Sequence, residues 1–551
     1  MSWRNLAVPV TLFIVALGWF ASVFSQYSSG VAIRADGTIK LEKAIQWYER
    51  GSFYYEYPQK ELDPEERGIA YHLSGAMPHL TTYENKRVIT YPESFAIFVG
   101  IWQAMLPSSS LAWISILFFL VELAAFLWLA RSALELSLPI TLLGGLLFLF
   151  CTPHYIFSLQ LQEVVVASSL LLVAIALFLK QENNAGAAIS GALASIAFSV
   201  RQEVVIAALL LCILVFAGNE WRFWKGDNSR QARSRSGFTG LIGGLIKRND
   251  LVFVFGVTFL IGFAIYLAYN TALYGEALGS RYEAVKDGSS GIAARWHIFR
   301  SILVGNFDPA RPVLGLLAQM PFLMLYIAMP FLYGSLSREA RFLGLLGIIT
   351  AISVALISPN DSWGGWGQRF TMIVHGPLIL GFLAILQKLQ TGKSRRLLRS
   401  LALISVSFLV AGAFWLASFG WKLERQTLNY TAEIQSDLRR VRSLPETENA
   451  PVISTADLYY WAGLEYFKQP LFQLREDSSV ASDLDYFIER AKDSNINYIV
   501  IRDSAMYREK EKNRYDSLIQ HLEKERKIKL ESIPETESGT ERFYRFRVSD
   551  I

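Results

Sequence analysis

Long hydrophobic runs recur over the first 420 residues of this chain of 551 residues, and polar connections separate them. Most approach or reach the roughly 20 apolar residues that a helix needs to cross a bilayer. The runs are Leu6–Phe24, Leu111–Ala130, Leu138–Phe150, Val164–Leu179, Ala185–Val200, Val204–Ala217, Leu251–Tyr269, Val313–Leu332, Phe342–Ile357, Met372–Leu386 and Leu401–Phe419. A shorter run, Phe95–Leu106, is ambiguous. The pattern predicts an α-helical polytopic membrane protein with about 11 to 12 transmembrane helices.

Composition agrees with this pattern, because 52% of the residues are hydrophobic and the mean hydropathy is +0.29. The net charge of +5 is spread over connections and the C-terminal tail, without a basic stripe interleaved with stacking aromatics. Nucleic acid is therefore not expected as a partner. The two cysteines, Cys151 and Cys212, lie within or beside apolar runs and are interpreted as small packing residues. Neither a disulfide framework nor a zinc spacing is present. We assign no cofactor and no metal-ligating residue.

Clusters of Lys and Arg in two connections, residues 218–250 and 388–399, predict that both lie in the cytoplasm. Residues 1–26 are interpreted as an uncleaved signal anchor that runs outward. Residues 270–312, 359–371 and all those after Gly420 are then expected on the outer face. Twelve full spans would place residues 218–250 outside, against their charge. One run between Phe95 and Phe150 is therefore expected not to span independently, which gives about 11 spans.

The chain changes character after Trp421, where charged residues abound and short apolar strands alternate with helical patterns. Strands are predicted at 451–454, 498–502, 527–533 and 542–548, helices at 480–493 and 507–525, and the stretch 464–467 stays unassigned. This order predicts a small extracytoplasmic α/β domain over residues 421–551, which follows a membrane domain over residues 1–420. No glycine-rich phosphate loop follows 452–454, so no nucleotide is assigned.

A polar segment, residues 26–91, interrupts the hydrophobic runs directly after the first of them. Nothing in lipid requires so long an interruption, so we expect this loop to carry chemistry on the outer membrane face. Asp36 precedes a helical pattern whose apolar face, Leu41, Ala44, Ile45 and Tyr48, suits a helix at the membrane interface. A carboxylate there could accept the proton of an acceptor hydroxyl. The alternative is an aspartate that caps the helix from Thr38 onward.

Two further candidates stand at predicted helix ends. Glu163 directly precedes the run that begins at Val164. An ionisable group at the end of a membrane helix is either functional or favoured there by the helix dipole. Arg201-Gln202-Glu203 splits an apolar stretch into two helices. Arg201 could bind a lipid phosphate, and the alternative is an interfacial arginine paired with Glu203.

A short outer loop, residues 363–370, combines glycines, aromatics and one arginine. Backbone amides of glycines can approach a ligand, Trp363 and Trp366 can stack on a sugar or an isoprenoid, and Arg369 can bind phosphate. The alternative assigns both tryptophans to an interfacial belt. The six histidines are scattered and are interpreted as structural.

In this order, the pieces from Met1 to Gly420 resemble the GT-C superfamily of polyprenyl-phosphate-sugar-dependent glycosyltransferases, which includes the protein mannosyltransferases and the lipid A aminoarabinose transferases. Asp36 ahead of its helix, Tyr91-Pro92, Glu163, Arg201-Gln202-Glu203 and Gly367-Gln368-Arg369-Phe370 carry the resemblance. The chain departs from the common pattern where glycine follows Asp36, and where Glu93, Gln202 and Gln368 stand in place of prolines.

The resemblance implies an inverting transfer of a sugar from a polyprenyl-phosphate carrier to a lipid, glycan or protein acceptor. Asp36 or Glu163 would be catalytic, Arg201 and Arg369 would bind the donor phosphate, and Tyr91, Trp363 and Trp366 would contact sugar or lipid. A bacterial inner membrane is the expected location. A surface-polysaccharide polymerase or ligase is the alternative. A secondary transporter fits less well, since charges gather at helix ends and no internal repeat is visible.

Overall fold

The computed structural model describes residues 3–27, 29–34, 36–57, 59–67, 79–180, 183–224, 238–280, 291–306, 313–360, 368–391, 396–455, 458–474, 480–504, 509–533 and 541–550. The chain forms two compact units. The first, here called the membrane unit, comprises Met1–Ser22 and Trp113–Glu424. The second, here called the loop–sheet unit, comprises Val23–Ala112 and Arg425–Ile551.

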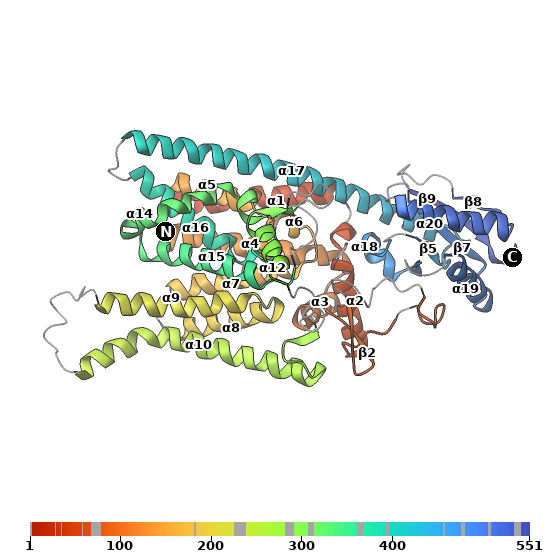
Figure 1. Cartoon of the computed structure of the whole chain (residues 1–551), viewed down its shortest axis with the longest axis horizontal. Coiled ribbons are helices and arrows are strands. Elements are labelled where there is room, and N and C mark those ends of the chain that lie inside the picture. The colour runs from red at the N-terminus through yellow and green to blue at the C-terminus, as the bar shows by residue number, and fades with distance from the viewer. Residues whose placement is uncertain are drawn as a thin grey trace. The chain divides into compact units, whose positions relative to one another are not determined.

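The membrane unit is built from helices (Figure 1), of which α1, α4 and α17 extend beyond its boundaries. The helices are α1 (Trp3–Gln26), α4 (Ala112–Trp128), α5 (Leu138–Phe150), α6 (His154–Phe157), α7 (Glu163–Lys180), α8 (Asn184–Val200), α9 (Val204–Trp224), α10 (Phe238–Tyr274), α12 (Ile292–Leu303), α13 (Leu316–Gln319), α14 (Met329–Leu332), α15 (Arg338–Ile357), α16 (His375–Thr391) and α17 (Arg396–Ser443). A short π-helix (Leu129–Ala133) extends α4, and the 3-10 helix η7 (Met372–Val374) leads into α16. Strand β3 (Gly305–Asn306) pairs with β4 (Val313–Leu314).

Seven helices in the described part of the chain are long and apolar enough to cross a membrane, and four shorter apolar helices accompany them. This confirms the prediction of a polytopic α-helical membrane protein. Sidedness stays a prediction. The ambiguous run Phe95–Leu106 forms α3 (Glu93–Met105), which belongs to the loop–sheet unit.

The run Val313–Leu332 does not form the one continuous helix that its apolar composition predicts. The segment forms β4, the single-turn helix α13, a 3-10 helix (Pro321–Ala328) and α14. Pro321 and Pro330 explain part of the break, because a proline lacks the backbone N–H that a continuous helix would use.

Close contact between helices depends on glycine at several points in the membrane unit. A Cβ on Gly191 of α8 would lie 2.5 Å from the Phe255 carbonyl oxygen of α10, and one on Gly262 of α10 would lie 2.3 Å from Ser195 Oγ of α8. Small residues on both helices therefore let the two backbones approach, as is common between membrane helices. Figure 1 shows α8 and α10 as neighbours.

The loop–sheet unit joins residues 23–112 to the C-terminal tail. From residues 23–112 it takes the 3-10 helix η1 (Ser29–Ala32), α2 (Asp36–Arg50), β1 (Leu80–Tyr83), β2 (Lys86–Ile89), α3 and η2 (Ser108–Leu111). From the tail it takes the end of α17, β5 (Val452–Ser454), α18 (Tyr459–Ala462), η8 (Gly463–Phe467), β6 (Leu471–Gln473), α19 (Val480–Asp493), β7 (Tyr498–Ser504), α20 (Glu509–Gln520), a π-turn (His521–Glu525), β8 (Glu531–Ser532) and β9 (Glu541–Arg547).

The tail forms a five-stranded sheet in the order β6-β5-β7-β9-β8. β5 pairs in parallel with β6 and with β7, whereas β9 is antiparallel to β7 and to β8. The predicted α/β domain is therefore confirmed as a fold, and α19 matches the predicted helix. The sequence does not predict strand β6, because its three residues lie in a stretch without period-2 alternation.

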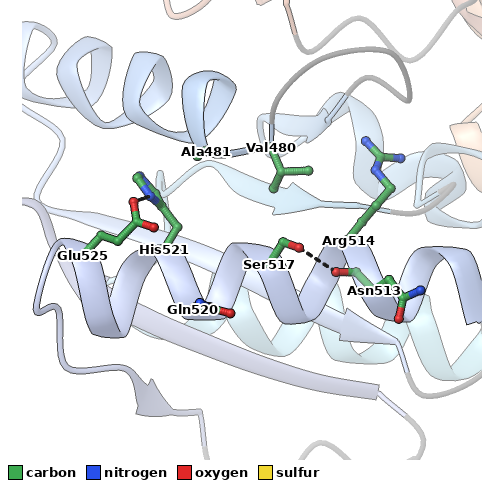
Figure 2. Close-up of a pocket in the computed structure, with 8 residues that line it drawn as sticks. All are labelled: Val480, Ala481, Asn513, Arg514, Ser517, Gln520, His521 and Glu525. Atoms are coloured by element: carbon green, nitrogen blue, oxygen red, sulfur yellow. Dashed lines mark hydrogen bonds and ion pairs between the residues drawn. The ribbon is translucent and has the colours of Figure 1, made fainter.

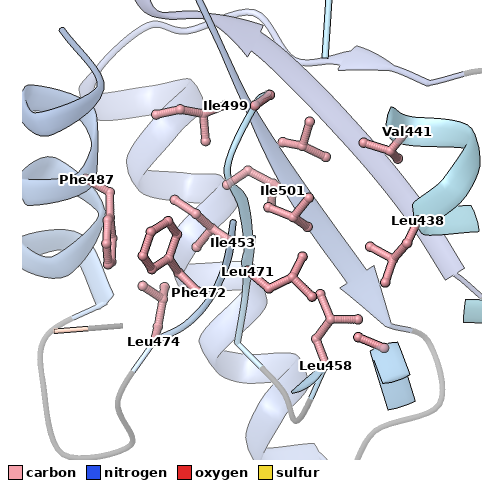
Figure 3. Packing of buried hydrophobic residues seen from close by; sticks show 14 of the residues in the cluster. Leu438, Val441, Ile453, Leu458, Leu471, Phe472, Leu474, Phe487, Ile499 and Ile501 are labelled. Carbon is pink, nitrogen blue, oxygen red and sulfur yellow. The ribbon is translucent and has the colours of Figure 1, made fainter. Parts of the chain in front are cut away.

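One hydrophobic core holds the loop–sheet unit together. Strand residues such as Ile453, Ile499 and Ile501 pack against Phe487 of α19 and Leu438 of α17 (Figure 3). The same cluster contains Ile39 of α2 and the loop residues Tyr55, Tyr57, Leu80, Ile89 and Tyr91. The polar loop thus shares its core with the tail. The sequence pattern groups that loop with a membrane domain ending at residue 420, a boundary that stays a prediction.

Candidate functional site

The break at residues 201–203 forms as predicted. Helix α8 ends at Val200, Arg201 is extended with φ −146° and ψ 114°, and α9 begins at Val204. Gln202 anchors the break, since its amide nitrogen donates to the Tyr266 hydroxyl at 3.1 Å and to the Leu278 carbonyl at 2.6 Å. Side-chain hydrogen bonds within the membrane unit therefore hold this turn in place.

Arg201 is almost completely buried, with 3% of its surface exposed, and it lies between two carboxylates. Its Nη1 donates to Glu163 Oε1 at 3.0 Å, and its Nη2 donates to Glu203 Oε1 at 2.8 Å. Glu163 is buried at the first turn of α7. Arg201 therefore pairs with Glu203, as the alternative interpretation predicts, and it pairs with Glu163 as well. Arg201 Nε has no hydrogen-bond partner among the described groups and remains as a donor.

Phe370 brings the two predicted phosphate-binding arginines together. The Arg201 guanidinium carbon lies 5.4 Å from the centre of the Phe370 ring, and that of Arg369 lies 5.8 Å from the same centre. Both distances are typical of cation–π contacts. We call Glu163, Arg201, Glu203, Arg369 and Phe370 the Phe370 cluster. It gathers residues from α7, from the α8–α9 break and from the segment before α16.

Asp36 lies in the other unit, as the first residue of α2, and it is partly buried. The Gly37 amide donates to the Arg34 carbonyl at 2.9 Å, which closes the turn that leads into the helix. Asp36 therefore stands at the helix N-terminus, where the dipole favours a negative charge. Its catalytic role stays a prediction.

Burial on α2 is not restricted to the predicted apolar face. Ile39, Leu41 and Ala44 are buried, but so are the polar side chains Thr38, Lys40, Glu42, Lys43 and Gln46. Tyr48, predicted on the apolar face, is 54% exposed. The first turns of α2 are thus enclosed by the loop–sheet unit on several sides.

The lysines and Glu42 on α2 are residues that sequence reasoning missed. Lys43 Nζ bonds to Glu93 Oε1 at 2.6 Å, to the Ile89 carbonyl at 2.8 Å and to the Tyr91 carbonyl. Burial lowers the pKa of Lys43, and the neighbouring Glu93 carboxylate partly opposes that shift. Burial also raises the pKa of Glu42 well above its ordinary value, against a lowering by Arg50. A titratable group whose pKa is shifted by burial is a candidate for proton transfer.

Tyr91 is buried beside these cations rather than open to solvent. Lys40 Nζ lies 4.9 Å from the centre of its ring, and the His79 ring stacks on it with centroids 6.1 Å apart. Its role in sugar or lipid contact stays a prediction. Trp363 and Trp366 fall outside the described residues. In the described part of the chain, no group of three or more His, Cys, Asp or Glu residues is placed to hold a metal ion.

The loop–sheet unit also contains a pocket of about 550 Å³ beside α20 (Figure 2). Val480 and Ala481 of α19 form one wall, and Arg514, Ser517 and His521 contribute to the other. Arg514 donates to the Leu474 carbonyl at 3.0 Å, and His521 bonds to both Asp485 and Glu525. These polar groups therefore have structural partners within the unit, and we assign the pocket no ligand.

Comparison with known proteins gives structural neighbours only. No known family pattern matches the chain, and no curated protein is detectably similar in sequence. The chain is similar to the structure of ArnT from Cupriavidus metallidurans bound to undecaprenyl phosphate, with a TM-score of 0.47, 11% identity, and coverage of 99% of this chain and 97% of that one.

It is also similar to the oligosaccharyltransferase AglB from Archaeoglobus fulgidus in complex with an inhibitory peptide and a dolichol-phosphate. The TM-score is 0.46 at 12% identity, over 91% of this chain and 69% of that one. Because both TM-scores are below 0.5, this likeness does not decide the family or the activity. Function has to be argued from the residues.

Proposed function

We propose that this protein is a glycosyltransferase of the GT-C superfamily, which transfers a sugar from a polyprenyl-phosphate carrier to an acceptor hydroxyl on the outer face of the membrane. The Phe370 cluster is the observation that supports this proposal most. Two arginines on one aromatic ring, in a unit with membrane-spanning helices, suit an anionic headgroup attached to an apolar chain.

The chemistry is a direct displacement. The acceptor oxygen bonds to the anomeric carbon, the bond from that carbon to the phosphate oxygen breaks, and polyprenyl phosphate leaves with the bonding electrons. The hydroxyl proton passes to Asp36, and the anomeric configuration inverts. Arg369 and Arg201 stabilise the charge that develops on the phosphate, an effect that is strongest where water is excluded.

Glu163 and Glu203 affect the charge balance around Phe370. Their two negative charges exceed the one positive charge of Arg201, so Arg369 supplies the second positive charge near Phe370. Glu163 bonds to a guanidinium and is better suited to orient Arg201 than to accept a proton. We therefore assign the base to Asp36 and an orienting role to Glu163.

The experiment that tests this proposal measures single-turnover sugar transfer by Asp36→Asn and Glu163→Gln in membranes that contain the cell's lipid-linked sugars. Asparagine caps a helix about as well as aspartate but cannot accept the proton. We expect Asp36→Asn to slow transfer by about two to four orders of magnitude while polyprenyl-phosphate binding is retained. Glu163→Gln should mainly weaken that binding.

Glu61→Gln serves as the matched control, since Glu61 is an exposed carboxylate on the same loop and should leave transfer unchanged. Near-normal transfer by Asp36→Asn would remove Asp36 from the mechanism. A collapse of transfer in Glu163→Gln alone would move the base to Glu163. Mass spectrometry of lipid-linked sugars in cells with and without the protein would identify the sugar.

A further inference from the structure

A glutamate lies buried within one of the membrane-spanning helices. Glu122 is the one charged residue of α4 and is 1% exposed, in the apolar segment Ser108–Ala133. Ionisable groups at such positions are costly unless they are paired. Glu122 Oε2 accepts a hydrogen bond from Ser168 Oγ at 3.1 Å and lies 3.0 Å from His154 Nδ1.

The two ring nitrogens of His154 face different groups. His154 is fully buried at the start of α6, and its Nε2 lies 3.2 Å from the Met372 carbonyl oxygen. A carbonyl can only accept, so Nε2 carries a hydrogen. Nδ1, on the opposite side of the ring, then faces the Glu122 carboxyl at 3.0 Å from Oε2. Glu122 and His154 therefore form a buried polar pair in close contact.

This pair is connected to the segment that contains Arg369. Met372, whose carbonyl His154 binds, opens η7 three residues after Arg369. The Thr371 hydroxyl donates to the Gln368 carbonyl at 3.3 Å and lies 3.2 Å from His375 Nε2. Because a hydroxyl has one hydrogen, Thr371 accepts from His375. The segment 368–372 is thus tied down on both sides of Phe370.

Aromatic side chains enclose the pair. The His154 ring lies 5.1 Å from the Phe148 ring, 6.2 Å from the Phe119 ring and 5.4 Å from the His375 ring, between centroids. His154 is thus held in one orientation. A rigid, desolvated hydrogen bond to a main-chain carbonyl is a suitable means of fixing a short connection.

We propose that Glu122 and His154 are positioning residues: Glu122 holds the buried His154 ring in place, and the ring fixes the main chain at Met372 and thereby sets where the Arg369 guanidinium stands against Phe370. This inference rests on the proposed function only in that Arg369 is taken to bind the donor phosphate. It assigns a role to two buried ionisable side chains that take no part in the transfer step.

The test compares His154→Phe, His154→Gln, Glu122→Gln and Glu122→Leu in the full-length protein. Hydrogen exchange of the amides at residues 369–374 reports on the main chain, and binding of sugar-free polyprenyl phosphate reports on Arg369. Glu122→Gln keeps a polar group of nearly the same shape beside Nδ1, so His154 keeps its place and its bond to Met372. We expect that variant to exchange and bind as the wild type does.

His154→Phe removes the hydrogen bond to Met372 and the contact with Glu122, and Glu122→Leu places an apolar group against Nδ1. Both should expose residues 369–374 to faster exchange and weaken polyprenyl-phosphate binding about tenfold. His154→Gln, which keeps one donor near Met372, should recover part of each effect and guards against a phenylalanine variant that fails to fold. In an Arg369→Ala background, His154→Phe should cost no further affinity.

Three outcomes would overturn the inference: unchanged exchange in both His154 variants, equal damage from Glu122→Gln and Glu122→Leu, or a full additional loss of affinity from His154→Phe in the Arg369→Ala background. The failure of the proposed function would look different. In that case neither the wild type nor Arg369→Ala would bind polyprenyl phosphate measurably, while the exchange difference between Glu122→Gln and Glu122→Leu would persist.

Discussion

Arg201 and Arg369 both contact the Phe370 ring, but they differ in their surroundings. Arg201 is buried between two carboxylates, whereas Arg369 is partly exposed. A charge-assisted hydrogen bond contributes about 1.5 to 3 kcal/mol, so alanine at either position should weaken polyprenyl-phosphate binding by about tenfold or more. Arg369→Lys should recover affinity only in part, because lysine cannot form the two-pronged contact. Equilibrium binding to the purified protein measures both effects.

Arg341→Ala is the control for that experiment. Arg341 also lies in the membrane unit, and its guanidinium carbon stands 5.0 Å from the centre of the Tyr333 ring. It shares the guanidinium–aromatic contact but not the Phe370 cluster, so its loss should leave binding unchanged. If alanine at Arg201 and at Arg369 also leaves binding unchanged, the phosphate site lies elsewhere, and Arg281 and Arg295 are the next candidates.

At the scale of elements, η8 supports the turn that leads into α2. Gly463 has φ 55° and ψ −126°, a conformation that favours glycine, and a Cβ there would lie 2.3 Å from the Ile33 carbonyl oxygen. Gln435 of α17 donates from Nε2 to the Gly30 carbonyl at 3.2 Å. The tail therefore holds the residues that directly precede Asp36.

Gly463→Ala should displace that turn and cost of order 1 to 3 kcal/mol in backbone strain alone. We expect sugar transfer to fall at least about tenfold while polyprenyl-phosphate affinity is retained, since the Phe370 cluster belongs to the other unit. Steady-state kinetics with varied donor separates the two effects. Gly51→Ala is the control, because Gly51 also has a positive φ, 65°, but a Cβ at that position would meet no atom within 4 Å. Equal transfer by both variants would contradict the support role.

At the scale of a whole unit, stability should depend on pH through His521. His521 Nδ1 lies 2.7 Å from Glu525 Oε2, and its Nε2 lies 2.8 Å from Asp485 Oδ1, which also accepts from Arg526 Nε at 3.0 Å. Burial alone would lower the pKa of His521, but hydrogen bonds to the two carboxylates outweigh it and raise the pKa above 6.5. Burial alone would raise the pKa of Asp485, but hydrogen bonds to Arg526 and His521 lower it below 3.8.

The direction of this pH dependence follows from the linkage between proton binding and folding. A raised histidine pKa stabilises the fold below pH 6.5, and that contribution is lost as pH rises through the raised value. The lowered Asp485 pKa contributes above pH 3.8 and is lost as pH falls through the lowered value. The wild type should therefore exceed His521→Asn in unfolding midpoint most at mildly acidic pH, and the gap should narrow above neutrality. A gap that does not change between about pH 5 and 9 would contradict this assignment.

The shared core also changes how the tail is interpreted. Residues of α2, of the first polar loop and of the sheet belong to one hydrophobic cluster. Removing the tail would expose Ile39 and Tyr55 and disturb the helix that Asp36 begins. A deletion would therefore not isolate a role of the tail, because it would disturb the polar loop as well. Point substitutions such as Gly463→Ala are the sharper experiment.

Local pattern alone determined the membrane helices, the break at residues 201–203 and most strands and helices of the tail. These features depend on runs of apolar residues, on periodicity and on helix-ending residues, all of which lie close together in the sequence. Reliance on local pattern also explains the error at Val313–Leu332, where apolar composition predicted one continuous helix and several short elements formed instead.

Only the tertiary structure decided which charges are buried and what they contact. Lys43 has the pattern of a solvated residue on an amphipathic helix until Glu93 and two carbonyls are placed around it. Glu122 did carry a signal, as a lone charge in an apolar run, but its partner His154 lies 32 positions away. The Phe370 cluster likewise joins Glu163, Arg201 and Arg369. Such pairings depend on how helices pack, and packing is a long-range property that no local pattern encodes.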